Sequence, residues 1–220
     1  MAMGWEKIYR QKGDLQGYFS VLPKIKNCVR VFRAKGYHRV LDLACGTGRH
    51  TLYLAKHGFD VYATDMAATG LKMAREKAES LGLNNIHFQE HDMRSIPFAD
   101  KFFDAVICTL AIHHGTAAQI QQTVDEIHRV LKPGGMVITD MPSVMTEGVG
   151  LGQEIEKNTY LLVHGDMEDD VPHHYTTREE VQRFFRDFCG VSIRLQTHNY
   201  TGRKDGKKHF SKRFYITAVK

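Results

Sequence analysis

Apolar positions along the chain follow two different periods. Strand-like runs recur at regular intervals, at residues 39–44, 61–64, 86–90, 103–110 and 136–140. Between several of them, apolar residues recur at helical spacing, over residues 51–56, 71–81 and 120–131. Strands and helices that alternate at this interval form right-handed βαβ units. The pattern therefore predicts a doubly wound α/β domain with a parallel sheet covered on both faces.

Both ends of the chain extend this pattern. Helical stretches over about residues 4–36 precede the first strand, and Gly36 provides a stop signal for the second of them. Near the other end, Thr177–Glu180 reads as a capping box that opens a helix. Strands are expected at about Val191–Gln196 and Phe214–Val219.

The segment over about residues 142–176 interrupts the alternation. It carries Gly148, Gly150, Gly152 and Gly165, then the acidic cluster Glu168–Asp170 and the pair His173–His174. A long irregular segment inside a compact domain is typical of a lid or a binding loop. We therefore expect a substrate lid here, inserted into a single domain of residues 1–220.

Composition limits the class of protein. At 220 residues, with 42% hydrophobic and 25% charged residues, the chain fits one globular domain. No apolar run is long enough to span a membrane, and residues 1–7 do not resemble a signal peptide. The four cysteines are widely separated and form no C-x-x-C pair. These features predict a cytoplasmic protein with reduced cysteines and no membrane partner.

A glycine-rich turn, Cys45-Gly46-Thr47-Gly48, follows the first predicted strand. Ligands of open α/β sheets bind beyond the carboxyl ends of the strands, and glycine lets the backbone approach them closely. Thr51 occupies the position where G-x-G-x-x-G requires its third glycine, which disfavours a nicotinamide enzyme. The chain also lacks the G-x-x-x-x-G-K-[ST] pattern of a P-loop.

The stretch Val40–Arg49 resembles the first motif of class I S-adenosylmethionine-dependent methyltransferases. The resemblance continues with Asp65 at the end of the second strand, His91-Asp92-Met93 after the third, and Leu131–Gly135 before the fifth. It covers about residues 38–141 and implies a Rossmann-like, mostly parallel seven-stranded sheet with an antiparallel C-terminal strand. Residues 46–55 most resemble the small-molecule branch that includes tellurite-resistance-type methyltransferases.

The resemblance also implies roles in binding S-adenosylmethionine. Asp42 and the glycine-loop backbone would hold the methionine end, and Asp65 would accept hydrogen bonds from both ribose hydroxyls. Asp92 would accept from the adenine amino group, with Met93 packed on the ring. Tyr9 and Tyr18 could close over the sulfonium with their aromatic faces. The full set of expected cofactor-binding residues is Tyr9, Tyr18, Asp42, Ala44, Gly46, Gly48, Asp65, Met66, Asp92, Met93 and Leu110.

Methyl transfer needs a general base only if the attacking group must lose a proton. The candidates are His113 and His114, at the end of the fourth strand, and His174 in the lid. The chain has thirteen histidines, but no spacing matches a closed zinc site, because His87 and His91 straddle the end of a strand. We therefore expect no required metal.

Three functions remain open from the sequence. The favoured one is methyl transfer to a small molecule through oxygen, nitrogen, sulfur or a metalloid, by a monomer or a homodimer. The second is methylation of tRNA or another nucleic acid, suggested by the net charge of +5 and by the basic run Arg203–His209. That run also reads as the exposed tip of a hairpin. The third is a cofactor-binding sensor or scaffold without turnover.

Overall fold

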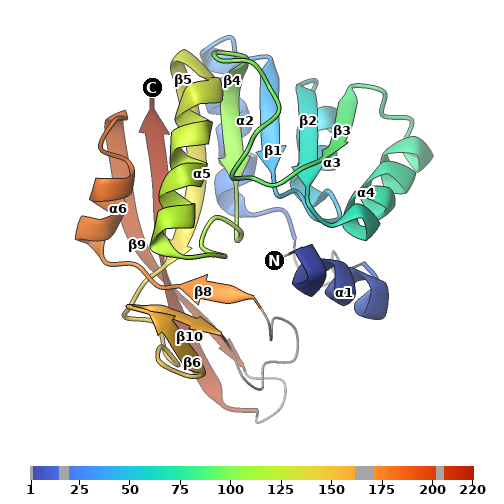
Figure 1. Cartoon of the computed structure of the whole chain (residues 1–220). Helices are drawn as coiled ribbons and strands as arrows, with labels where there is room; N and C mark the ends of the chain where they lie inside the picture. Colours follow the sequence, from blue (N-terminus) through green and yellow to red (C-terminus); the bar gives the residue numbers. More distant parts are fainter. Residues whose placement is uncertain (1, 15–19, 162–170, 202–205) are drawn as a thin grey trace.

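The computed structural model describes the chain except for residues 1, 15–19, 162–170 and 202–205. Its main sheet has seven strands in the order β3-β2-β1-β4-β5-β10-β9 (Figure 1). The first five strands pair in parallel, and β10 is antiparallel to both β5 and β9. This confirms the predicted sheet. Its strands are β1 (Arg39–Leu43), β2 (Asp60–Asp65), β3 (Ile86–Glu90), β4 (Phe103–Cys108), β5 (Leu131–Pro142), β9 (Cys189–Thr201) and β10 (Lys208–Val219).

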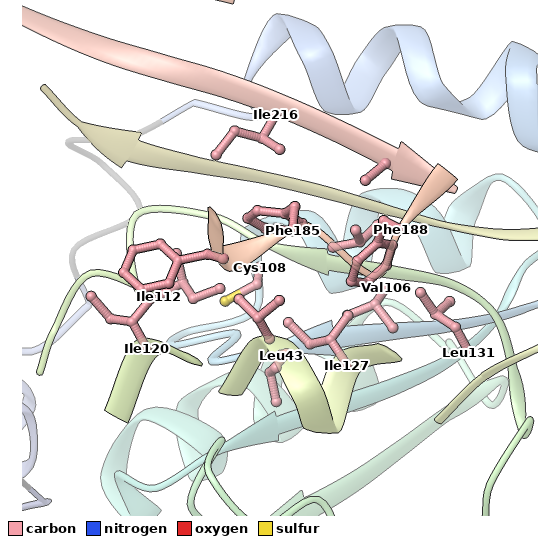
Figure 2. Close-up of a cluster of buried hydrophobic side chains, with 14 of the residues drawn as sticks. Leu43, Val106, Cys108, Ile112, Ile120, Ile127, Leu131, Phe185, Phe188 and Ile216 are labelled. Carbon is pink, nitrogen blue, oxygen red and sulfur yellow. The ribbon is translucent and has the colours of Figure 1, made fainter. Parts of the chain in front are cut away.

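Helices cover both faces of this sheet: α2 (Pro23–Ala34), α3 (Arg49–Lys56), α4 (Ala68–Ser80), α5 (Ala117–Val130) and α6 (Arg178–Phe184). A further helix, α1 (Ala2–Lys12), contacts α4. Side chains of α5 and of the end of α6 pack on one face, where Ile127 of α5 and Phe185, directly after α6, share a core with Val106 (Figure 2). Side chains of α2 and α3 pack on the other face, against Ile107. Neighbouring residues of β4 thus enter opposite cores, which explains why the central strands read as continuous apolar runs.

The strand order reverses between β1 and β4. β1 pairs with β2 on one side and with β4 on the other, so the connections leave these two strands in opposite directions. The turns that follow the carboxyl ends of β1 and β4 therefore diverge and leave a crevice between them. The fold places the glycine turn and the loop that carries His113 and His114 at this crevice.

The inserted segment is more regular than its sequence indicates. β6 (Gln153–Glu156), β7 (Thr159–Leu161) and β8 (Pro172–His174) form a separate antiparallel sheet. The expectation of an irregular lid is wrong for these strands, since polar residues and glycines obscure the alternation that marks a strand. Gly165 and the acidic cluster Glu168–Asp170 lie outside the described residues.

The C-terminal hairpin is longer than predicted. β9 and β10 pair from Cys189 and Val219 at one end to Thr201 and Lys208 at the other. Most of β9 is exposed, so its outer part lacks the apolar alternation that reveals a half-buried strand. The basic run Arg203–His209 reaches into the start of β10, and its residues 203–205 lie outside the described part of the chain.

The capping box predicted at Thr177–Glu180, where α6 begins, forms only in part. Thr177 accepts a hydrogen bond from the Glu180 amide at 3.2 Å, but the structure does not form the reciprocal half of a capping box there. The Glu180 carboxylate lies instead 3.3 Å from His174. A complete capping box forms at Thr116 and Gln119, where α5 begins. Within the described part of the chain, every helix is too short or too polar to cross a membrane.

Candidate functional site

A cavity that is partly open to solvent lies at the crevice between β1 and β4. It is lined by the glycine turn, the end of β2, the residues after β3 and β4, helix α1 and one residue of the lid segment. Its lining residues are Trp5, Tyr9, Leu43, Ala44, Cys45, Gly46, Thr47, Arg49, Asp65, Met66, His91, Met93, Thr109, Leu110, Ala111, His114 and Val171.

The glycine turn reverses the chain between β1 and α3 through left-handed backbone conformations. Ala44, Gly46 and Gly48 have φ values of 58°, 57° and 81°. Gly48 is the N-cap of α3 and has no side chain that could cap the helix, while the Asp42 carboxylate accepts from the Thr51 amide in its first turn. The positive end of the helix lies beside the cavity, which Thr47 and Arg49 line.

Gly48 also lies close to helix α4. A Cβ atom placed on Gly48 would lie 2.9 Å from the Cβ of Ala74. Gly58 has a similar φ of 87°, but its Cβ would meet no atom within 4 Å. We expect Gly48→Ala to lower the free energy of unfolding by about 1–3 kcal/mol more than Gly58→Ala, because only Gly48 adds a steric clash to the backbone strain.

Urea unfolding of the two glycine variants beside the wild type measures this difference. Equal losses of stability in Gly48→Ala and Gly58→Ala would show that the contact with α4 is not tight. A larger loss in Gly48→Ala would show that close packing of α3 on α4 holds the turn in place.

Asp65 is the acidic residue at the bottom of the cavity. One of its carboxylate oxygens accepts from the Gly46 amide at 2.8 Å and the other accepts from the Ala67 amide at 2.9 Å. Burial raises the pKa of this carboxyl, although the amide hydrogen bonds act against the shift. The Met66 amide also acts on this carboxylate, so three backbone amides share its two oxygens. Because a carboxylate has about four acceptor positions, Asp65 can still accept from a hydroxyl of a ligand.

Helix α1 covers the glycine turn. Glu6 accepts hydrogen bonds from the Thr69 amide at 3.0 Å and from its hydroxyl at 2.6 Å, which fixes α1 to the start of α4. A Cβ atom on Gly46 would lie 2.5 Å from the Tyr9 hydroxyl oxygen, so the tyrosine needs glycine at this position. Tyr9 thus lies over the cavity as expected, whereas Tyr18 is outside the described residues.

Arg49 is a cavity residue that the sequence interpretation missed. It begins α3 and lies beside the glycine turn, where burial lowers its pKa although Asp42 acts in the opposite direction. A guanidinium there offers a partner for an anionic group such as a carboxylate. Its position directly after Gly48 was the available signal. Trp5, His91, Thr109 and Val171 also line the cavity, and their place depends on packing between distant segments.

The described residues of the expected cofactor set divide into two groups. Seven line the cavity: Tyr9, Ala44, Gly46, Asp65, Met66, Met93 and Leu110. Asp42, Gly48 and Asp92 do not. Asp42 accepts from the Thr51 hydroxyl at 2.6 Å behind the turn, and Asp92 forms an ion pair with Arg94. The structure therefore gives Asp42 and Asp92 partners other than a cavity ligand.

The three candidate bases occupy different places. His114 lines the cavity, and its ring lies 5.5 Å from that of Trp5. His113 is buried behind it, and burial together with nearby positive groups lowers its pKa well below the usual value. His174 does not line the cavity: its Nδ1 lies 2.7 Å from the Thr159 hydroxyl. Of the three, only His114 can touch a molecule in the cavity.

Known proteins resemble this chain in sequence and in fold. Residues 40–135 match the family model described as a methyltransferase domain. Over 120 residues the chain is 39% identical to the demethylmenaquinone methyltransferase of Thermus thermophilus, covering 53% of each protein. The chain spans about half the length of the curated relatives it matches.

Solved structures share the fold at low sequence identity. A S-adenosylmethionine-dependent methyltransferase from Methanosarcina mazei matches with a TM-score of 0.66 at 23% identity, over 92% of this chain and 99% of that one. TehB from Haemophilus influenzae matches with a TM-score of 0.68 at 16% identity, over 99% of this chain and 67% of that one. Identities at this level support the fold and leave the substrate open.

Proposed function

We propose that this chain, which carries a methyltransferase domain over residues 40–135, transfers a methyl group from S-adenosylmethionine to a small-molecule acceptor. The observation that carries the proposal is that the glycine turn, the Asp65 carboxylate and His114 line the same cavity. One cavity can thus contain both the groups that suit the cofactor and a residue suited to the acceptor.

The residues around the turn fit the cofactor at both ends. Asp65 would hold a ribose hydroxyl, with Met66 and Met93 against the adenosine. Arg49 would hold the carboxylate of the methionine part, next to the N-terminus of α3. Tyr9 would cover the turn from above. When bound, the cofactor supplies an electrophilic methyl group on a sulfonium.

The protein's own contribution is alignment and exclusion of water. Trp5 and Tyr9 on α1 and Val171 on the lid segment cover the cavity beside His114. Because two hydrogen bonds join Glu6 to Thr69, α1 is held in this covering position. For an acceptor that must lose a proton, His114 is the member of the three predicted histidines that lines the cavity and could act as the base.

Titration calorimetry with S-adenosylhomocysteine tests the cofactor assignment. We expect 1:1 binding to the wild type, and we expect Asp65→Ala to weaken it by about 1–3 kcal/mol because charge-assisted hydrogen bonds are lost. Asp100→Ala removes a carboxylate from an exposed ion pair with Arg129 and should leave the affinity unchanged.

Two results would contradict the proposal. One is a folded wild type that does not bind the ligand, and the other is equal affinity in Asp65→Ala and the wild type. Once binding is established, a screen for methyl transfer should include small acceptors and tRNA. Transfer to tRNA alone, with an affinity that falls steeply with salt, would replace the small-molecule assignment.

A further inference from the structure

Three histidines meet between the loop after β4 and strand β8 of the lid segment. His113, His114 and His173 each provide one ring nitrogen, and these nitrogens all lie within 4.8 Å of one another. All three side chains are buried. His114 and His173 form a β-bridge, and the His174 amide donates to the His113 carbonyl at 3.0 Å. Backbone pairing between loop and lid therefore holds the rings together.

We propose that His113, His114 and His173 form a binding site for one divalent transition-metal ion of the zinc type. Imidazole nitrogen is a preferred zinc ligand, and three histidines plus one exchangeable position are typical of a catalytic zinc site. Within the described part of the chain, the cluster contains three histidines and no carboxylate or thiolate. In this proposal the fourth position would take water or a substrate.

The backbone of the lid orients one ring of the cluster. The Nδ1 of His173 lies 2.8 Å from the Val171 carbonyl, so a metal ion would bind this ring through Nε2. Tetrahedral zinc would bring the nitrogens to roughly 3.3 Å from one another, so the widest pair would close by up to about 1.5 Å.

Arg213 is the charged group nearest the cluster. Its Nη2 lies 3.4 Å from the His113 Nδ1, a long contact that metal binding can displace. The same guanidinium donates to Asp140 through Nε at 2.7 Å, and Lys24 also donates to Asp140. Two cations therefore share one anion. The excess positive charge lowers the affinity for a metal ion that three histidines would otherwise provide.

The site adjoins the proposed reaction, because His114 belongs both to the cluster and to the cavity wall. This part of the inference rests on the proposed function. An acceptor hydroxyl or thiol at the exchangeable position would release its proton to solvent, since the metal lowers its pKa. Its lone pair would form the bond to the methyl carbon, while the electron pair of the breaking sulfur–carbon bond stays on sulfur. The favoured acceptors are therefore small molecules with an ionisable O–H or S–H group.

The test uses the whole, metal-free protein. Titration calorimetry with Zn²⁺ should show one ion per chain, and Co²⁺ should give the visible absorption of a tetrahedral site. His173→Gln should weaken Zn²⁺ binding at least about tenfold. His87→Gln removes an exposed histidine of β3 and should bind Zn²⁺ like the wild type.

Two outcomes would overturn the metal site. They are a folded wild type that binds S-adenosylhomocysteine without stoichiometric Zn²⁺, and equal Zn²⁺ affinity in His173→Gln and the wild type. If His173→Gln does not fold, His114→Gln provides the same comparison, and the Co²⁺ spectrum of the wild type is an independent test. Stoichiometric Zn²⁺ binding without S-adenosylhomocysteine binding would support the metal site and contradict the proposed function.

Discussion

Asp140→Asn should lower the free energy of unfolding by about 3–5 kcal/mol at neutral pH, because it leaves two largely buried cations without their counter-ion. The Asp140 carboxylate is fully buried at the end of β5. It accepts from Lys24 at 2.6 Å and from Arg213 at 2.7 Å. It also accepts from the Leu110 amide at 3.2 Å, so the same charge helps to fix a residue of the cavity wall.

The loss of stability should depend on pH. Burial by itself raises the pKa of Asp140, but the charges of Arg213 and Lys24 outweigh burial and lower the pKa to about 2. A carboxyl whose pKa is lower in the folded state stabilises the protein above its unfolded pKa of about 3.8. That contribution is lost as the pH falls from about 4 toward 2.

Urea unfolding of Asp140→Asn and the wild type, at neutral pH and near pH 3, measures both effects. The difference between the two proteins should be smaller at the lower pH. Asp100→Asn alters an exposed ion pair and should leave the unfolding midpoint essentially unchanged. An Asp140→Asn variant as stable as the wild type at neutral pH would show that the buried cations find other partners.

Asp42→Asn should raise the free energy of unfolding above neutral pH, in contrast to the loss expected for Asp140→Asn. Burial raises the pKa of Asp42 to about 7, although the Thr51 hydroxyl and the charge of Arg49 act against the shift. Ionising this carboxyl above neutral pH therefore destabilises the folded state. Asparagine stays neutral and can still accept from the Thr51 hydroxyl, so the variant does not carry this penalty.

The sign of the Asp42 effect follows from the direction of the shift. A carboxyl with a raised pKa in the folded state contributes stability below its unfolded pKa of about 3.8, and that stability is lost as the pH rises toward 7. From pH 4 to pH 8, the stability of Asp42→Asn relative to the wild type should rise by about 3–4 kcal/mol.

Urea unfolding at both pH values measures this change, and S-adenosylhomocysteine titration of the same variant adds a functional comparison. Asp42 lies behind the turn and does not line the cavity, so we expect Asp42→Asn to retain most of its affinity, unlike Asp65→Ala. A constant stability difference between pH 4 and pH 8 would contradict the raised pKa. A large loss of affinity would restore Asp42 to the cofactor site.

Most of the described residues that were predicted to bind the cofactor line the cavity. Asp65 ends β2 and Met93 lies three residues after β3, and the carboxyl ends of parallel strands meet at one edge of a sheet. Their approach to the cavity could therefore be predicted from their position in the chain. Asp42 lies within β1 and Asp92 lies two residues after β3, but each has a nearer partner, Thr51 or Arg94.

The positions of the histidine rings in the lid segment could not be predicted from the sequence. The adjacent pair His173–His174 is visible in the sequence, but its two rings separate because neighbouring residues of a strand face opposite sides. His173 joins His113 and His114, while His174 contacts Thr159. A metal-ligand search by spacing could not find this cluster, since about 60 residues and the four elements α5, β5, β6 and β7 separate its members.

The sequence by itself determined the order of elements in the main sheet and its helices, the mostly parallel pairing and the place of the glycine turn. These properties depend on local periodicity and on general rules of βαβ connection, which are both present in the linear chain. The tertiary structure decided which side chains reach the cavity, how Lys24 and Arg213 share Asp140, and how the lid histidine joins the β4 loop. Those contacts join segments distant in the chain, and they arise only when packing fixes the distances between side chains.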